Sequence, residues 1–112
     1  IDTKFELIWS FILDFENQAN PDEVIREEIF TWRKIAAKII FKNQRIMEIS
    51  NSLTDIGIKK KDSLHIACAI EAKSKFFITV DKGILKKENI INEIIIINPI
   101  NFIQLLEGKN EI

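Results

Sequence analysis

Apolar residues along this chain follow two patterns, which alternate from one end to the other. Short continuous apolar runs at 5–9, 76–80 and 94–97 indicate β-strands, and the run at 76–80 is typical of a strand buried on both faces. Between the runs, apolar residues recur at intervals of three and four, which indicates amphipathic helices. This alternation predicts a single domain over residues 1–112, a three-layer α/β/α sandwich with a parallel sheet.

Capping residues divide the helical stretches. The second helix is expected to run from the Asn20-Pro21 start through Ile39, and the third covers 46–56 and ends at a left-handed Gly57. The expected capping residues of the other helices are Ser10 before Phe11, Asp62, and Asn98 before Pro99.

Net charge is −1, which excludes a global field that attracts nucleic acid. The charge is nevertheless uneven. Residues 1–56 hold seven Lys/Arg and ten Asp/Glu, whereas residues 57–112 hold nine and seven. A phosphate-binding surface would therefore have to be local, and the alternative is a solvated loop and helix end. The lysines in question are Lys59, Lys60, Lys61, Lys82, Lys86 and Lys87.

Cys68 is the single cysteine, so the chain can form no internal disulfide, which fits a reducing compartment. The most apolar run, at 94–97, is far shorter than a membrane span requires. We therefore expect a cytoplasmic protein without a membrane partner.

Two acids stand where an α/β sheet gathers ligands. Asp81 follows the apolar strand at 76–80, and Asp62 stands at the start of a helix nineteen residues earlier. Because ligands bind outside the carboxyl ends of parallel strands, both side chains can reach one place. With lysines beside them, they suit a divalent metal working on a phosphate. The alternative is that Asp81 is only a turn residue and Asp62 only a helix cap.

The other candidate residues are weaker when each is considered alone. Glu16 could be a surface glutamate, and Asp14, two positions away on the same helix, points to a different face. His65 is expected to be a packed, hydrogen-bonded side chain, and Cys68 a small core residue. No zinc-type Cys/His spacing, no Ser-His-Asp set and no glycine-rich phosphate loop is present in the sequence.

Several segments of the chain, at residues 57–58, 62–69, 77–82 and 97–99, together resemble the second half of PIN-domain proteins. That family often shows a G-I-x-x-x-D-A-L-H-x-A stretch, an F-x-T-x-D strand end and a strand leading into N-P. Here Ser63 stands where alanine is usual, and Val80 where threonine is common. The matching segments are residues 57–58, 62–69, 77–82 and 97–99 with Phe102; residues 7–10, 14–17 and 20–21 resemble the first half of one branch more weakly.

The resemblance implies a metal-dependent ribonuclease, and many such proteins are toxins of type II toxin–antitoxin pairs. It implies that Glu16, Asp62 and Asp81 hold Mg²⁺ or Mn²⁺, with Ser10 and Thr79 as supporting polar residues. Lysines near the acids would contact RNA phosphates. These are Lys59, Lys60, Lys61 and Lys82.

One departure concerns the start of the domain. The family's first acid lies on an N-terminal strand upstream of the segments matched here, and Asp2 does not correspond to it. We therefore expect an N-terminally truncated domain with little activity, which closes the gap by association as a homodimer. The alternative is a catalytically inactive PIN-like module that binds protein or RNA.

Overall fold

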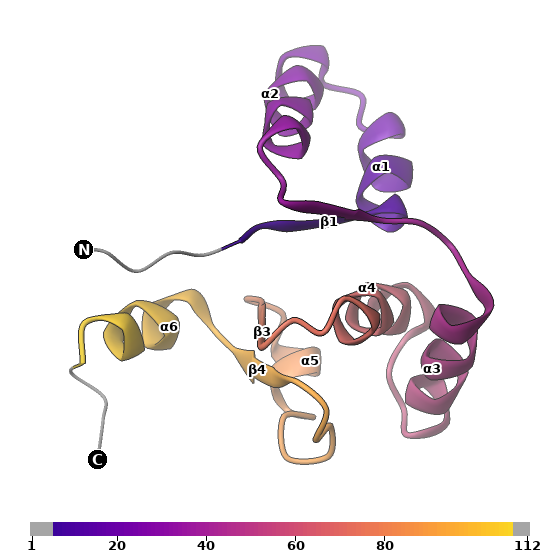
Figure 1. The fold of residues 1–112 in the computed structure, drawn as a ribbon, viewed down its shortest axis with the longest axis vertical. Coiled ribbons are helices and arrows are strands. Elements are labelled where there is room, and N and C mark those ends of the chain that lie inside the picture. The colour runs from indigo at the N-terminus through magenta and orange to yellow at the C-terminus, as the bar shows by residue number, and fades with distance from the viewer. Residues whose placement is uncertain (1–5, 109–112) are drawn as a thin grey trace.

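The computed structural model describes residues 6–108, which form a mixed α/β structure in which helices and short strands alternate. The elements are β1 (Ile8–Ser10), α1 (Phe11–Gln18), α2 (Glu23–Lys34), β2 (Lys38–Ile40), α3 (Gln44–Asp55), α4 (Lys60–Glu71), β3 (Phe76–Ile78), α5 (Lys82–Leu85), β4 (Ile95–Ile97) and α6 (Pro99–Leu106). Figure 1 shows α1 and α2 above β1, and α3 and α4 below it.

The strands of the described residues form two separate parallel pairs. Strand β1 pairs with β2 in the register Trp9 to Ile39, and β3 pairs with β4 in the register Phe77 to Ile96. Helix α4 contacts both β1 and β3, so it spans from one pair to the other. The carboxyl ends of β1 and β3 lead directly into α1 and toward α5.

The core is centred on the packing of α3 against α4, the most extensive contact between two elements. Ile46 on α3 and Ile66 on α4 are completely buried. Between the same helices, the hydroxyls of Ser50 and Ser63 lie 2.7 Å apart, and Ser63 Oγ donates to the Lys60 carbonyl, also at 2.7 Å. Ser63 stands at a position where the family that the sequence resembles usually has alanine. Here its hydroxyl has a buried polar partner on α3.

Two predicted strands are shorter than expected. The first strand is Ile8–Ser10 rather than 5–9, and Phe5 lies outside the described residues. The strand predicted at 76–80 ends at Ile78. It is not buried on both faces, because Ile78 is 45% exposed and Val80 beyond it is 77% exposed. The apolar run extends past the strand because Thr79 and Val80 belong to the approach to α5.

The long second helix was predicted wrongly at both ends. Asp22, not Asn20, is its cap and accepts a hydrogen bond from the Ile25 N–H, while Asn20 Oδ1 accepts from the Asp22 N–H. The helix ends at Lys34, and Ile39 lies in β2. Ile39 fits the spacing of the predicted helix only by coincidence. The pairing of β2 with β1 determines its extended conformation.

The remaining helix boundaries follow the expected capping residues, with one exception. Ser10 and Asn98 occupy the N-cap positions of α1 and α6, and Gly57 has a φ of 98° after α3. Asp62 is not a cap, because Lys59 holds that position and Asp62 lies inside the first turn of α4. A carboxylate there still favours the helix dipole.

None of the helices within residues 6–108 is long and apolar enough to cross a membrane.

Candidate functional site

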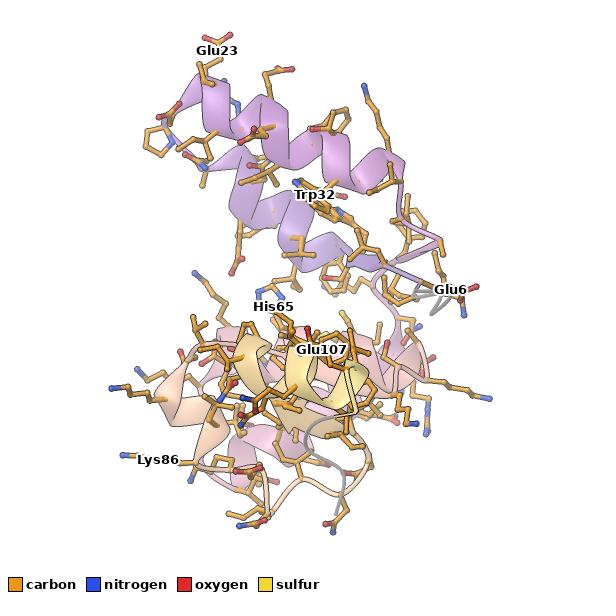
Figure 2. The ribbon with its side chains drawn as sticks, turned by 90° about the vertical axis from the view of Figure 1, so that its left-hand side faces the viewer. Glu6, Glu23, Trp32, His65, Lys86 and Glu107 are labelled. Atoms are coloured by element: carbon orange, nitrogen blue, oxygen red, sulfur yellow. The ribbon has the colours of Figure 1, made fainter. Side chains whose placement is uncertain are left out.

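Glu16 lies where α1 approaches α4. Its Oε2 is 3.0 Å from Nε2 of His65 and 3.4 Å from Nζ of Lys61. Glu16 and His65 are partly buried, with side chains 31% and 18% exposed. Figure 2 shows His65 pointing from α4 toward α1. Glu16 is therefore not the isolated surface glutamate that it could have been.

The surroundings of Glu16 change its acidity. Partial burial opposes ionisation, but the hydrogen bond and charge of His65, followed by those of Lys61, outweigh it and hold the pKa of Glu16 below its usual 4.5. These surroundings thus favour the ionised carboxylate over its neutral form. Asp14 points elsewhere, as expected, and accepts from Trp9 Nε1 at 2.8 Å and from Arg33 Nε at 3.0 Å.

Asp62 lies beside this cluster on α4. It follows Lys61 directly and precedes His65 by three positions, a spacing that makes side chains neighbours on a helix surface. Asp62 is therefore a neighbour on α4 of the two residues, Lys61 and His65, that Glu16 contacts from α1. The Asp62 side chain is half-buried and makes no cap hydrogen bond.

Asp81 has a structural role of its own. It caps α5, where its Oδ1 accepts a hydrogen bond from the Ile84 N–H at 3.1 Å. Thr79 Oγ1 in turn accepts from the Asp81 N–H at 3.1 Å, so both predicted residues shape the turn after β3. Asp81, for which the alternative above was a turn residue, is thus the cap of α5, whereas Asp62, for which the alternative was a cap, is not a cap.

The predicted phosphate-binding lysines are all exposed, but they are not equally free. Lys61 contacts Glu16, and Lys60 Nζ donates to Asn51 Oδ1 at 3.3 Å. Lys59 is the N-cap residue of α4, and Lys82 opens α5. Of the three consecutive lysines at the start of α4, Lys61 therefore contacts Glu16, whereas Lys60 contacts α3.

Ser10 is buried and hydrogen-bonded to the Cys68 side chain rather than to the backbone of α1. Burial raises the pKa of the Cys68 thiol to about 11, although the bond to Ser10 opposes that change. Cys68 is only 2% exposed and belongs to the core, as predicted. Ser10 therefore connects β1 with α4.

The three predicted metal ligands suit Mg²⁺ by chemistry, since the ion prefers carboxylate oxygens. By position they are not gathered. Within residues 6–108, no group of three or more His, Cys, Asp or Glu side chains is arranged to hold a metal ion. Glu16 Oε2 instead contacts Lys61 Nζ and His65 Nε2, and Asp81 Oδ1 accepts a hydrogen bond from the Ile84 N–H.

Sequence reasoning missed the contacts that define this site. His65 was expected to be packed and hydrogen-bonded, and it is, but nothing in the sequence named Glu16 as its partner. The pairing of Lys61 with Glu16 was missed for the same reason. Contacts between residues more than forty positions apart leave no local signal in a single sequence.

Comparison of the chain with protein-family models, with curated proteins and with solved structures gives no match.

Proposed function

We propose that the protein is a metal-dependent endoribonuclease of the PIN-domain type, which hydrolyses RNA phosphodiester bonds with Mg²⁺ or Mn²⁺. In this proposal Glu16, Asp62 and Asp81 are the metal ligands. The bound ion would activate water and neutralise charge on the phosphate. In this proposal the enzyme works in the cytoplasm as the toxin of a toxin–antitoxin pair.

One observation carries the proposal more than the others. Glu16, 45 positions before Lys61, contacts it, and Asp62 directly follows Lys61 in α4, so one predicted ligand lies near the segment that carries another. In our proposal Lys59, Lys60 and Lys61, at this start of α4, bind RNA phosphates. Ser10 and Thr79 would orient ligands or water.

The arrangement of the strands supports the proposed α/β/α sandwich. Helices α1 and α4 both contact β1, and α4 also contacts β3. A parallel strand added between β1 and β3 would join the two pairs into one sheet and cover two open edges. In our proposal such a strand comes from association, with a homodimer as the simplest form.

A second candidate is a catalytically inactive PIN-like module that binds protein or RNA. It is favoured by the dispersed ligands, since Lys61 and the Ile84 N–H already satisfy two of the carboxylates. In the remaining alternative, an unrelated α/β protein, Asp81 and Asp62 are only a turn and a cap, and the protein binds no metal.

RNA cleavage by the full-length protein, with Mg²⁺ or Mn²⁺ and with chelator, tests the proposal. We expect metal-dependent cleavage that is lost in Asp81→Asn and Glu16→Gln. The matched control is Asp22→Asn, because Asp22 caps α2 just as Asp81 caps α5. Mn²⁺ binding, measured by electron paramagnetic resonance, separates the candidates. Binding of Mn²⁺ without RNA cleavage supports the inactive module. No binding of Mn²⁺ excludes the nuclease and leaves Asp81 and Asp62 as a turn and a cap.

A further inference from the structure

Lys61, one of the lysines proposed to bind RNA phosphates, already has an anionic partner in the structure. Its Nζ lies 3.4 Å from Glu16 Oε2, and the same oxygen lies 3.0 Å from His65 Nε2. Both members of the ion pair remain within reach of solvent, since the side chains of Lys61 and Glu16 are 70% and 31% exposed. Ion pairs as exposed as this one are weak, so another anion can displace Glu16 from Lys61.

The preceding lysine has a partner of a different kind. Lys60 Nζ donates to Asn51 Oδ1 on α3 at 3.3 Å, and this side-chain amide carries no charge. Because consecutive residues of a helix point about 100° apart, Lys60 reaches α3 while Lys61 reaches α1. A phosphate that binds Lys60 replaces a neutral acceptor, whereas one that binds Lys61 must displace a carboxylate.

The charge of Glu16 therefore weakens phosphate binding at Lys61. Because the pKa of Glu16 is held below its usual 4.5, the carboxylate is charged at neutral pH. A phosphodiester gains from the Lys61 ammonium only the excess over what that ammonium already gains from Glu16. The carboxylate also repels a phosphate that approaches the same ammonium. Both effects act on Lys61 more strongly than on Lys60.

We propose that the ion pair of Glu16 and Lys61 is an autoinhibitory contact, in which Glu16 occupies the ammonium that would otherwise bind a phosphodiester of single-stranded RNA. Binding of RNA at Lys61 breaks this ion pair, and with it one of the contacts between α1 and α4. Masking of Lys61 rests on the proposed function only in that Lys61 binds a phosphate. It requires neither a metal ion nor cleavage.

RNA binding measured with chelator tests the contact, because metal-dependent cleavage cannot then occur. The probe is a fluorescein-labelled single-stranded RNA of about ten nucleotides, and its fluorescence anisotropy is followed as full-length protein is added. Glu16→Gln should tighten binding about two- to fivefold, as expected when an exposed ion pair is released. The matched control is Glu23→Gln, which removes the same charge at an exposed position far from His65 and should leave the affinity unchanged (Figure 2).

A second substitution assigns the gain in affinity to Lys61. Lys61→Met should cancel the gain of Glu16→Gln, whereas Lys60→Met should weaken binding equally with and without Glu16→Gln. In Glu16→Gln, the plot of log affinity against log salt concentration should steepen by about 0.7, as for one more phosphate contact on a single strand. With Glu16 left in place, Lys61→Met should cost less affinity than Lys60→Met, a comparison that needs no substitution of Glu16.

The outcomes separate masking of Lys61 from the proposed function. Tighter binding by Glu16→Gln that Lys61→Met cancels supports masking, whether or not the wild-type protein cleaves RNA with metal. Equal effects of Glu16→Gln and Glu23→Gln, or an effect of Lys61→Met that does not depend on Glu16, would overturn masking and leave the nuclease proposal in place. No RNA binding by any of these proteins would overturn both.

Discussion

Glu16 and His65 are 49 positions apart in the chain, yet His65 Nε2 lies 3.0 Å from Glu16 Oε2. With Lys61 on the same oxygen, this contact fastens α1 to α4 by charge where the two helices meet. Asp62 directly follows Lys61 in α4, so the contact lies near a second predicted ligand. The contact therefore links the stability of the fold to the candidate site.

Because the pKa of Glu16 is held below its usual 4.5, the folded state favours the charged carboxylate. This contribution to stability is complete above the unfolded pKa and is lost as the pH falls through the folded pKa. Glu16→Gln should therefore make the free energy of unfolding depend less on pH below 4.5, as measured by urea unfolding at a series of pH values. Glu88→Gln, at an exposed position, should keep the wild-type slope. An unchanged slope in Glu16→Gln would contradict the role of the contact.

The buried hydroxyl pair between α3 and α4 predicts a non-additive response to mutation. Ser63→Ala leaves the completely buried Ser50 hydroxyl without its partner and should reduce the free energy of unfolding by about 1–3 kcal/mol. The double variant Ser50→Ala/Ser63→Ala should recover most of that loss, because it leaves no buried polar group unpaired. Chemical denaturation of the two single variants and the double variant measures the coupling. Additive losses would show that the pair is not an energetic unit.

Cys68 should be unreactive in the folded protein. Its thiol is 2% exposed, and burial raises its pKa to about 11, so little thiolate exists at pH 8 and reagents cannot reach it. A thiol-specific chromogenic reagent should label less than stoichiometric amounts at pH 8 and one thiol per chain after denaturation in urea. Rapid native labelling would show that α4 separates from β1 far more often than this structure implies.

Gly57 should not tolerate a side chain. Its φ of 98° is unfavourable for any L-residue, so Gly57→Ala should reduce stability by about 1–2 kcal/mol. The added Cβ would also lie 3.1 Å from Lys87 Nζ, the mobile end of a long side chain. Thermal unfolding of Gly57→Ala in wild-type and Lys87→Met backgrounds separates the causes. The same loss in both backgrounds would identify backbone strain, and a loss confined to the wild type would identify the contact.

Where local chemistry decides an element, sequence reasoning located it. Asn98 with Pro99 begins α6, and the Asn98 side chain accepts from the Asn101 N–H at 2.7 Å, because a cap needs only residues within one turn. Gly57 ends α3 for a similarly local reason. The same reasoning failed at Ile39, because the choice between helix and strand there depended on β1, thirty positions away.

The features of the candidate site also fall into two groups, those that local sequence indicated and those that depend on tertiary contacts. The sequence by itself placed Asp62 near a helix start and Asp81 after a strand, and it indicated His65 and Cys68 as packed side chains, whereas Glu16 was singled out only by the family resemblance. Only the tertiary structure decided that Glu16 joins His65 and Lys61, that Asp81 caps α5, and that the polar side of α2 faces α1. Periodicity and capping act over a few residues and are visible in a single chain. The partner of a charged side chain is chosen by how distant elements pack, and a single sequence does not contain that information locally.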